Sequence, residues 1–223
     1  MWAVIPIKNL NETKHRLKSA LNPQERRDFF VEMFEDVLTT LLAVPELEQV
    51  AVATVCPIAG KIAKKYGTSV LFTEKDEGQT AAVTRTAEIL ESKRVAKMLM
   101  LPGDVPLVTV EEIQTVIATH ENACSTPDVP AMTIVPARDE QGSNCIVLSP
   151  PTAAPLRFGP NSYFPHLETA RKLGVSLQTL KLSGIGLDID TPEDLLELGR
   201  QSVQTRAQNY LQKYKILERI KIA

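Results

Sequence analysis

The sequence predicts an α/β domain whose parallel sheet is covered by helices on both faces. Short, apolar, β-rich runs alternate with longer segments of helical periodicity, which is the pattern of repeated βαβ units. The chain has 223 residues, 43% hydrophobic and 23% charged, enough to bury the core of one domain. No repeat, linker or low-complexity stretch interrupts this order. We therefore expect one soluble domain over 1–223, with 200–223 as a helical extension.

The amino-terminal half supplies the first elements of this alternation. Asn22 followed by Pro23 is an N-cap with proline at the first helical position, and it opens a long helix. A second helix over 58–66 stops at Gly67, and a third spans 79–92. The apolar face of the long helix repeats at helical spacing: Phe29, Met33, Val37 and Leu41. Three strands are expected in this half: residues 2–7, 50–54 and 70–72.

The carboxyl-terminal half continues the pattern. Thr109 and Glu112 predict a capping box before a helix that runs through Ile117, and Thr191 with Pro192 opens the last helix of the domain. Helical spacing then continues in a tail that packs on the domain or on a partner, and its apolar residues raise the hypothesis of a homodimer. That spacing runs through Tyr210, Tyr214 and Leu217. Three further strands are expected: residues 97–101, 132–135 and 146–148.

Composition excludes several classes of function. The formal net charge of -2 and pI near 6.0 give no basic footprint for nucleic acid. No stretch is long and apolar enough for a membrane helix, and the start lacks a signal peptide, so the cytoplasm is the expected location. The three cysteines are scattered without CxxC spacing, which predicts reduced, mostly buried thiols with neither disulfide nor zinc site.

Two candidate site segments follow the ends of strands, where ligands collect in parallel sheets. IPIKNLNETKHRL, residues 5–17, follows the first strand and carries three cations. It is either a loop that binds a polyphosphate or an ordinary solvated loop. It holds no GxxxxGK[ST] or GxGxxG motif. KMLMLPGDVPLV, residues 97–108, places Asp104 rigidly at a strand tip, where it is either a magnesium ligand or a cap of its own turn. The cations of the first segment are Lys8, Lys14 and Arg16.

A second acidic segment precedes the last helix. In the extended run GLDID, Asp188 and Asp190 share one face, because side chains alternate, while Leu187 and Ile189 point the other way. Two carboxylates so close need a cation between them. A magnesium ion shared with Asp104 is the more economical interpretation; the alternative is that Asp188 pairs with a lysine and Asp190 supports the Thr191 cap.

A fourth segment, residues 142–166, combines small polar residues before a strand with others before a helix. Hydroxyls, an amide and backbone N–H groups at a helix start suit an anion, although the proline-rich centre also fits a rigid crossover. The polar residues are Ser143, Asn144, Arg157, Gly159, Asn161 and Ser162.

These segments together resemble the 2-phospho-L-lactate guanylyltransferase family, which makes a precursor of coenzyme F-420. The likeness covers residues 1 to about 200 and rests on IPIKNLNETKHRL, EGQTAAV, LPGDVPLV, GSNCIVL, RFGPNSYFPHLE and GLDIDTPEDL. It implies a single nucleotidyltransferase-type domain, Rossmann-like and GT-A-like, with a mostly parallel mixed sheet flanked by helices. It also implies transfer of GMP from GTP to a phosphorylated three-carbon acid, with release of pyrophosphate.

The resemblance assigns roles to individual residues. It implies that Asp104, Asp188 and Asp190 hold Mg²⁺, and EGQTAAV is similar to the family's Gly-Leu-Asn-Ala-Ala near the base, with Gln79 and Thr80 replacing Leu-Asn. The implied catalytic residues are Lys8, Lys14, Arg16 and Asp104. The implied nucleotide-binding residues are Pro6, Lys8, Lys14, Gly78, Gln79, Thr80, Pro102 and Gly103. The implied acceptor-binding residues are Ser143, Asn144, Arg157, Gly159, Asn161 and Ser162.

Two other functions remain open from the sequence. One is another nucleotidyltransferase that uses GTP or CTP on a sugar phosphate or a molybdopterin. The other is a non-catalytic GTP-binding module whose tail contacts a partner. The acceptor also stays open among 2-phospho-L-lactate, phosphoenolpyruvate and 3-phosphoglycerate, because these acids differ by a double bond or by the position of one phosphate.

Overall fold

The computed structural model describes residues 1–10, 13–72, 78–124, 129–159 and 161–220. Asn11 and Glu12 of the basic loop, Glu77 of EGQTAAV and Pro160 of RFGP therefore lie outside the described residues. The strands are β1 (Trp2–Ile7), β2 (Gln49–Thr54), β3 (Ser69–Phe72), β4 (Met98–Met100), β5 (Ala131–Pro136), β6 (Ser143–Ser149) and β7 (Ser176–Thr179). The α-helices are α1 (Pro23–Leu42), α2 (Pro57–Lys65), α3 (Gln79–Ser92), α4 (Val110–Ala123), α5 (Tyr163–Lys172), α6 (Ser183–Gly186), α7 (Pro192–Arg200) and α8 (Arg206–Lys213).

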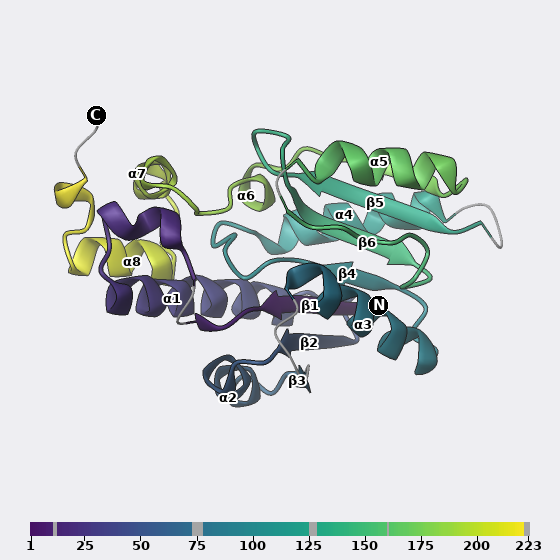
Figure 1. The fold of residues 1–223 in the computed structure, drawn as a ribbon, viewed down its shortest axis with the longest axis horizontal. Coiled ribbons are helices and arrows are strands. Elements are labelled where there is room, and N and C mark those ends of the chain that lie inside the picture. Colours follow the sequence, from purple (N-terminus) through teal and green to yellow (C-terminus); the bar gives the residue numbers. More distant parts are fainter. Residues whose placement is uncertain (11–12, 73–77, 125–128, 160, 221–223) are drawn as a thin grey trace.

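The sheet is mixed and mostly parallel, which confirms the predicted α/β fold class (Figure 1). Its strand order is β3-β2-β1-β4-β6-β5-β7. β1 pairs in parallel with β2 and β4, whereas β6 runs antiparallel to both of its neighbours, β4 and β5. The order reverses between β1 and β4, which is the switch point where such sheets open a crevice. Because β6 runs the other way, its first residues lie at the same edge as the end of β4.

Alternation along the strands divides the core between the two faces of the sheet. Ile5 and Leu99 pack in one buried cluster with α1, α2 and α4, whereas Val4 and Met100 pack in the other with α3 and α5. Both faces of the central strands are therefore apolar, as expected for a sheet covered on both sides. In the described part of the chain, no helix combines the length and apolar character needed to cross a bilayer.

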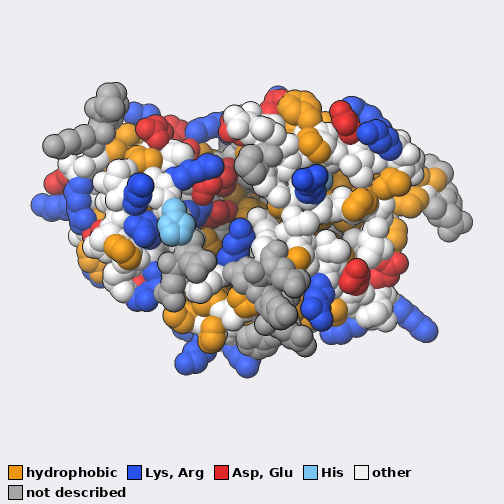
Figure 2. Space-filling model, in the orientation of Figure 1, with side chains coloured by type: hydrophobic (Ala, Val, Ile, Leu, Met, Phe, Trp, Pro, Cys, Tyr) orange, Lys and Arg blue, Asp and Glu red, His pale blue; other side chains and the backbone are white. Residues whose placement is uncertain are grey.

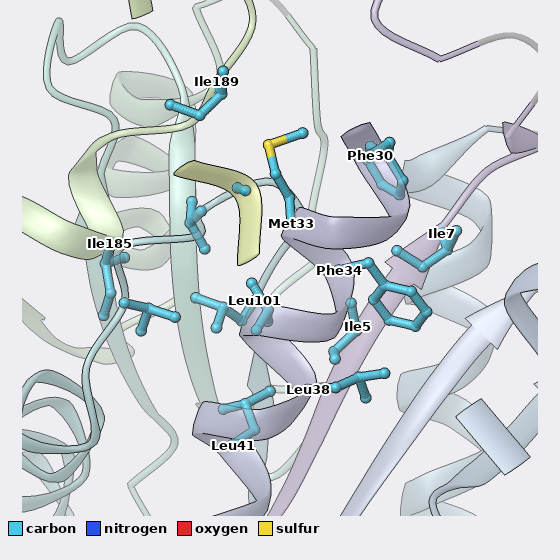
Figure 3. Close-up of a cluster of buried hydrophobic side chains, with 14 of the residues drawn as sticks. Ile5, Ile7, Phe30, Met33, Phe34, Leu38, Leu41, Leu101, Ile185 and Ile189 are labelled. Atoms are coloured by element: carbon cyan, nitrogen blue, oxygen red, sulfur yellow. The ribbon is translucent and has the colours of Figure 1, made fainter. Parts of the chain in front are cut away.

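The longest helix, α1, forms the larger core. The Asn22 side chain accepts a hydrogen bond from the Glu25 backbone N–H, and the Glu25 carboxylate accepts one from the Asn22 backbone N–H, so the predicted N-cap is a complete capping box followed by proline. Figure 3 shows Phe30 and Phe34 of α1 beside Ile7 of β1, and all three side chains are buried. The predicted apolar face is confirmed, because each of its four members is fully buried: Phe29, Met33, Val37 and Leu41.

The expected capping box at Thr109 and Glu112 is only half correct. Thr109 accepts a hydrogen bond from the Glu112 backbone, as predicted. The Glu112 carboxylate, however, accepts hydrogen bonds from the backbone N–H groups of Gly184 and Ile185, at 2.7 and 3.0 Å. Two charge-assisted bonds to otherwise unpaired N–H groups outcompete the single bond that the box offers. Glu112 therefore anchors α6, the short helix before the acidic segment.

The tail departs from the predicted continuous helix. Lys215 adopts a left-handed conformation with φ 49° and interrupts it, and a 3-10 turn, η3 (Leu217–Arg219), follows. α8 lies beside α1, where the Asp36 carboxylate accepts hydrogen bonds from the first backbone N–H groups of α8 (Figure 1). In this structure the tail thus packs on the domain, one of the two arrangements expected.

Candidate active site

The candidate site lies where β1 and β4 end and β6 begins. β1 delivers Lys8 to this edge, β4 delivers Asp104, and β6 starts with Ser143 and Asn144. They line a cleft of about 710 Å³. In Figure 2 a hollow near the middle of the face shown holds acidic side chains with basic side chains beside them. The cleft therefore occupies the switch point of the sheet, as the sequence predicts for a ligand site.

Lys14 is a buried cation beneath one wall of the cleft. Its backbone is left-handed, with φ 55° and ψ 43°, at the start of the 3-10 helix η2 (His15–Ser19). Its side chain is 3% exposed, and Nζ donates hydrogen bonds of 2.6 Å to Asp104 and to Asp190. Burial acts to lower the pKa of Lys14, but the charges and hydrogen bonds of both aspartates outweigh it and raise the pKa. Lys14 thus remains charged and ties the two acidic segments together.

Asp104 is held by a close approach of its loop to the core. A Cβ on Gly103 would lie 2.6 Å from Ile7 Cδ1, so a larger residue at the tip of β4 would require the end of the Ile7 side chain to move. The Asp104 carbonyl accepts a hydrogen bond of 3.0 Å from the Ile189 N–H. One carboxylate oxygen meets Lys14, while Asp104 Oδ1 is buried and has no hydrogen-bond partner in the described structure. An unpartnered buried carboxylate oxygen is costly, which makes it a candidate ligand atom.

In the segment after α6, residues 187–190, the side chains alternate between the core and the cleft as predicted, although these residues do not form a β-strand. Leu187 and Ile189 are buried in the larger core, while Asp188 and Asp190 line the cleft. Burial acts to raise the pKa of Asp190, but the Lys14 charge and hydrogen bond and then the Arg16 charge outweigh it and lower the pKa. The lysine of the alternative interpretation therefore pairs with Asp104 and Asp190 rather than with Asp188.

Asp188 has the opposite electrostatic character. Burial, and then the charge of Asp104, raise its pKa from 3.8 to about 6. Its Oδ1 accepts a hydrogen bond of 3.1 Å from Asn144 Nδ2, which also donates to the Ile185 carbonyl at 2.9 Å. Both amide hydrogens of Asn144 are therefore engaged in positioning Asp188 and α6. Its predicted contact with the acceptor stays a prediction.

The start of β6 and the turn before α5 contribute only uncharged side chains to the lining, and we call this part the neutral wall; Arg138 and Asp139, from the loop before β6, line the cleft as well. Gly159 has φ 140° and Asn161 has φ 57°, so left-handed conformations shape this turn. Ser162 is 5% exposed, occupies the N-cap position of α5 and makes no side-chain cap bond. Thr80 on α3 accepts a hydrogen bond of 2.9 Å from the Phe158 N–H. Thr80 thus holds the acceptor-side turn.

The cleft gathers most of the predicted residues. Those lining it are Lys8, Arg16, Gln79, Pro102, Asp104, Ser143, Asn144, Gly159, Asn161, Ser162, Asp188 and Asp190. The lining does not include Pro6, Lys14, Gly78, Thr80, Gly103 or Arg157. Pro6 lies in β1 opposite Ala53 of β2, beyond the last residue paired with β4. Lys14 and Gly103 act from beneath the wall, through the contacts given above.

The acidic residues suit a hard cation in their chemistry. Carboxylate oxygens are the donors that Mg²⁺ takes, and Asp104 Oδ1 is buried without a partner. Within the described ranges, however, no group of three or more His, Cys, Asp or Glu side chains stands close enough to hold a metal ion. Lys14 bridges Asp104 and Asp190, so the local cation is an ammonium. The donor types fit magnesium, and the ligand assignment stays a prediction.

Comparison with known proteins identifies the family. A sequence model described as "Guanylyl transferase CofC like" matches residues 1–221. The chain belongs to this family of guanylyl transferases. This confirms the resemblance drawn from the motifs and extends it through the tail.

Relatives within the family differ in the acceptor that their names specify. Phosphoenolpyruvate guanylyltransferase of Sphaerobacter thermophilus is 30% identical and aligns over 88% of this chain and 91% of its own. 3-phospho-D-glycerate guanylyltransferase of Colwellia psychrerythraea is 29% identical over 86% of this chain and 88% of its own. 2-phospho-L-lactate guanylyltransferase of Methanothermobacter thermautotrophicus is 28% identical over 95% of this chain and 89% of its own.

A solved structure supports the fold. A protein from Desulfovibrio desulfuricans G20, provisionally described as a nucleotide-diphospho-sugar transferase, superposes with a TM-score of 0.78. The two chains are 15% identical, and the match covers 98% of this chain and 96% of the other. At this identity the likeness concerns the fold alone.

Sequence reasoning missed several members of the site. Arg138 lines the cleft and pairs with Asp194 at 3.3 Å, and Phe158 lines it beside Thr80. His166 lies behind the neutral wall, bonded to Ser143. His166 stands inside RFGPNSYFPHLE, one of the motifs on which the family resemblance rests. That position was the available signal.

Proposed function

We propose that this chain transfers GMP from GTP to a phosphorylated three-carbon acid and releases pyrophosphate, as a step of coenzyme F-420 biosynthesis. The observation that carries the proposal is the two-sided cleft, charged on one wall and neutral on the other, in a chain that matches the guanylyl transferase family over residues 1–221. The named acceptors of its relatives, phosphoenolpyruvate, 3-phospho-D-glycerate and 2-phospho-L-lactate, are all acids of this class.

The proposed reaction needs no catalytic base. A phosphate oxygen of the acid is anionic at neutral pH, so it attacks the α-phosphorus of GTP directly and forms the new P–O bond. The bond from the α-phosphorus to the bridging oxygen breaks, and its electron pair leaves with pyrophosphate. The barrier is chiefly the repulsion between two polyanions, so catalysis requires charge neutralisation and alignment.

The charged wall supplies the neutralisation. Lys8 and Arg16 line the cleft and suit the triphosphate, while buried Lys14 fixes the geometry of Asp104 and Asp190. The neutral wall supplies hydroxyls for the acid, because Ser143 and Ser162 line the cleft although little of either residue is exposed to solvent. Gln79 and Thr80 lie at the α3 end, where the base is expected.

We extend the proposal to magnesium. Asp104 and Asp188 are its first candidate ligands, because Asp104 Oδ1 has no partner and because burial, and then the negative charge of Asp104, raises the pKa of Asp188. Asp190 would be the third ligand if its hydrogen bond from Lys14 were broken. Bound Mg²⁺ would neutralise developing charge on the phosphates.

Two expectations about the cellular setting also remain proposals. We propose a cytoplasmic location, where buried thiols such as those of Cys56 and Cys145 would stay reduced. A homodimer stays a hypothesis.

The test is pyrophosphate release measured with GTP and Mg²⁺ against each of the three acids, with CTP and a sugar phosphate as substituted reactants. We expect release with GTP and at least one of the acids. Release only with CTP or with the sugar phosphate would move the chain to another nucleotidyltransferase activity. GTP binding without any release would favour the binding module.

A further inference from the structure

His166 is a buried histidine on α5 that connects the two halves of the neutral wall. The residue is only 1% exposed to solvent. Nε2 accepts a hydrogen bond of 2.9 Å from the Arg157 backbone N–H, and Nδ1 lies 3.0 Å from Ser143 Oγ. The Phe158 ring meets the imidazole edge-on, with centroids 5.5 Å apart. One ring therefore touches the strand and the turn that form the wall.

The partners of His166 fix its tautomer. A backbone N–H can only donate, so Nε2 must be the unprotonated acceptor nitrogen. In a neutral imidazole the proton is then on Nδ1, which donates to Ser143 Oγ. Burial lowers the pKa of His166 to about 4, which keeps the ring neutral at physiological pH. Both ring nitrogens are thereby committed, and His166 has no proton to exchange with a substrate.

This arrangement determines what Ser143 presents. A hydroxyl carries one hydrogen, and because its oxygen accepts from His166, that hydrogen is left to be donated elsewhere. Ser143 lines the cleft, on the wall assigned to the acid. A hydroxyl held in this way is a donor, which suits an anionic oxygen.

We propose that His166 is a positioning residue that orients the Ser143 hydroxyl as a hydrogen-bond donor to an anionic oxygen of the phosphorylated acid, while holding the Arg157 backbone beside it. The inference rests on the proposed function for the identity of the acid. His166 selects for the acceptor rather than for GTP, because its contacts described here lie in the neutral wall.

His120 provides a matched control. It is also buried, and burial also lowers its pKa to about 4. Both of its ring nitrogens contact hydroxyls, Thr133 Oγ1 at 3.0 Å and Ser149 Oγ at 2.7 Å, whereas His166 contacts one hydroxyl and one backbone N–H. Ser149, however, ends β6 at the edge of the sheet away from Ser143. The two serines are six residue steps apart along the strand, which is roughly 20 Å.

The test compares two amide replacements. His166→Gln keeps an acceptor near the Nε2 position but loses the donor to Ser143, and we expect the acid KM to rise about tenfold with kcat and the GTP KM within twofold. His166→Asn keeps a donor near the Nδ1 position, so its acid KM should stay closer to wild type. His120→Gln should lower Tm and leave both KM values unchanged. The reverse order of the two His166 variants, or equal rises in both KM values, overturns the proposal.

A double variant tests whether His166 acts through Ser143. Ser143→Ala should raise the acid KM about tenfold by itself. Adding His166→Gln in that background should then cause no further rise, because the hydroxyl it orients is gone. A second tenfold rise would show that His166 acts independently and would overturn the proposal.

Nitrogen NMR separates this inference from the proposed function. In wild-type protein we expect the His166 ring to carry its proton on Nδ1 at pH 7, whether or not turnover is found with any acid. A proton on Nε2 overturns the inference even in an active enzyme. If wild-type protein has the expected tautomer but releases no pyrophosphate with any acid, the proposed function is wrong. The ligand that Ser143 contacts would then not be one of these acids.

Discussion

The two walls of the cleft use opposite physical means. The wall from β1, β4 and the 187–190 segment is built of charges, with a buried lysine between two aspartates. The wall from β6 and the turn before α5 is built of neutral hydrogen bonds fixed by His166 and Thr80. Charges neutralise a polyphosphate but discriminate poorly, whereas fixed neutral donors are sensitive to the position of an oxygen. Under the proposed function, we therefore expect turnover to depend on the first wall and acceptor choice on the second.

The largest effect is expected from the charged wall. Asp104→Asn keeps the side-chain shape but removes the charge, so we expect kcat to fall by roughly three orders of magnitude in a protein that still folds. Tm should fall by only a few degrees, because Lys14 keeps Asp190 as a partner. Asp190→Asn should act in the same direction. The measurement is pyrophosphate release at saturating GTP and Mg²⁺, beside thermal unfolding.

Asp36→Asn is the matched control for this variant. Asp36 accepts hydrogen bonds from the first N–H groups of α8, outside the cleft. Its loss should lower Tm without lowering kcat. If Asp104→Asn turned over at a near-normal rate at saturating Mg²⁺, turnover would not depend on the charged wall.

A second prediction concerns the neutrality of the buried histidines. The pKa values of His166 and His120 are lowered from 6.5 to about 4, so below pH 6.5 the unfolded chain binds more protons than the folded one. The two histidines therefore contribute a free energy of unfolding that is constant above pH 6.5 and falls between pH 6.5 and 4, by about 3 kcal/mol per histidine at most. Asp188, whose pKa is raised from 3.8 to about 6, opposes this fall over the lower part of the same range, so the histidine contribution is read from the difference between wild type and a histidine variant. Urea titrations at several pH values measure this slope, which should shrink in His120→Gln. An unchanged slope in that variant would contradict the assigned pKa.

A smaller effect sharpens the role of the buried cation. Lys14→Met leaves Asp104 and Asp190 without their ammonium, and Asp190 is 40% exposed, so screening reduces the cost to about 1–2 kcal/mol. Mg²⁺ should stabilise this variant more than wild type, because a metal replaces the lost charge. Tm with and without MgCl₂ measures the difference.

Lys65→Met serves as the control, since Lys65 is 72% exposed and pairs with Glu35 at 3.7 Å. Its response to MgCl₂ should equal that of wild type. If Lys14→Met responds no more than this control, the magnesium assignment to these carboxylates is wrong.

The smallest effect belongs to the neutral wall. Ser162→Ala should raise the KM for the acid about five- to tenfold, the value of one hydrogen bond, with the GTP KM within twofold. Thr169→Ala is the control on the same helix, because its hydroxyl bonds the Pro165 carbonyl and is exposed. Steady-state titration of each substrate gives both constants. Equal changes in both would assign Ser162 to the whole reaction instead of the acid.

Much of the fold followed from the sequence because periodicity and caps are local. The helix over Gln79–Ser92 and the strand over Trp2–Ile7 have the predicted bounds. β7 was missed because its four residues are half-buried or exposed and lack an apolar run. The Glu112 carboxylate was misassigned because its partners on α6 are distant in sequence.

The sequence predicted which residues belong to the site but not which of them contact one another. Alternation placed Asp188 and Asp190 together, whereas no local pattern shows that Lys14 is buried between Asp104 and Asp190. Likewise, the partners of His166 come from a strand and a turn that meet only in the folded sheet. Residue types identify candidates, and tertiary contacts decide which of them act together.

The most direct test of the central claim uses an acid whose phosphate oxygens carry ¹⁸O. Incubation with GTP and Mg²⁺, followed by mass spectrometry, should give a product of acid plus GMP that retains all of the label, together with unlabelled pyrophosphate. Label in the oxygen that bridges the two phosphorus atoms, read from the isotope shift of the α-phosphorus in ³¹P NMR, then shows attack of the acceptor phosphate on the α-phosphorus. Label in the pyrophosphate, or release of inorganic phosphate in its place, would contradict guanylyl transfer at this cleft.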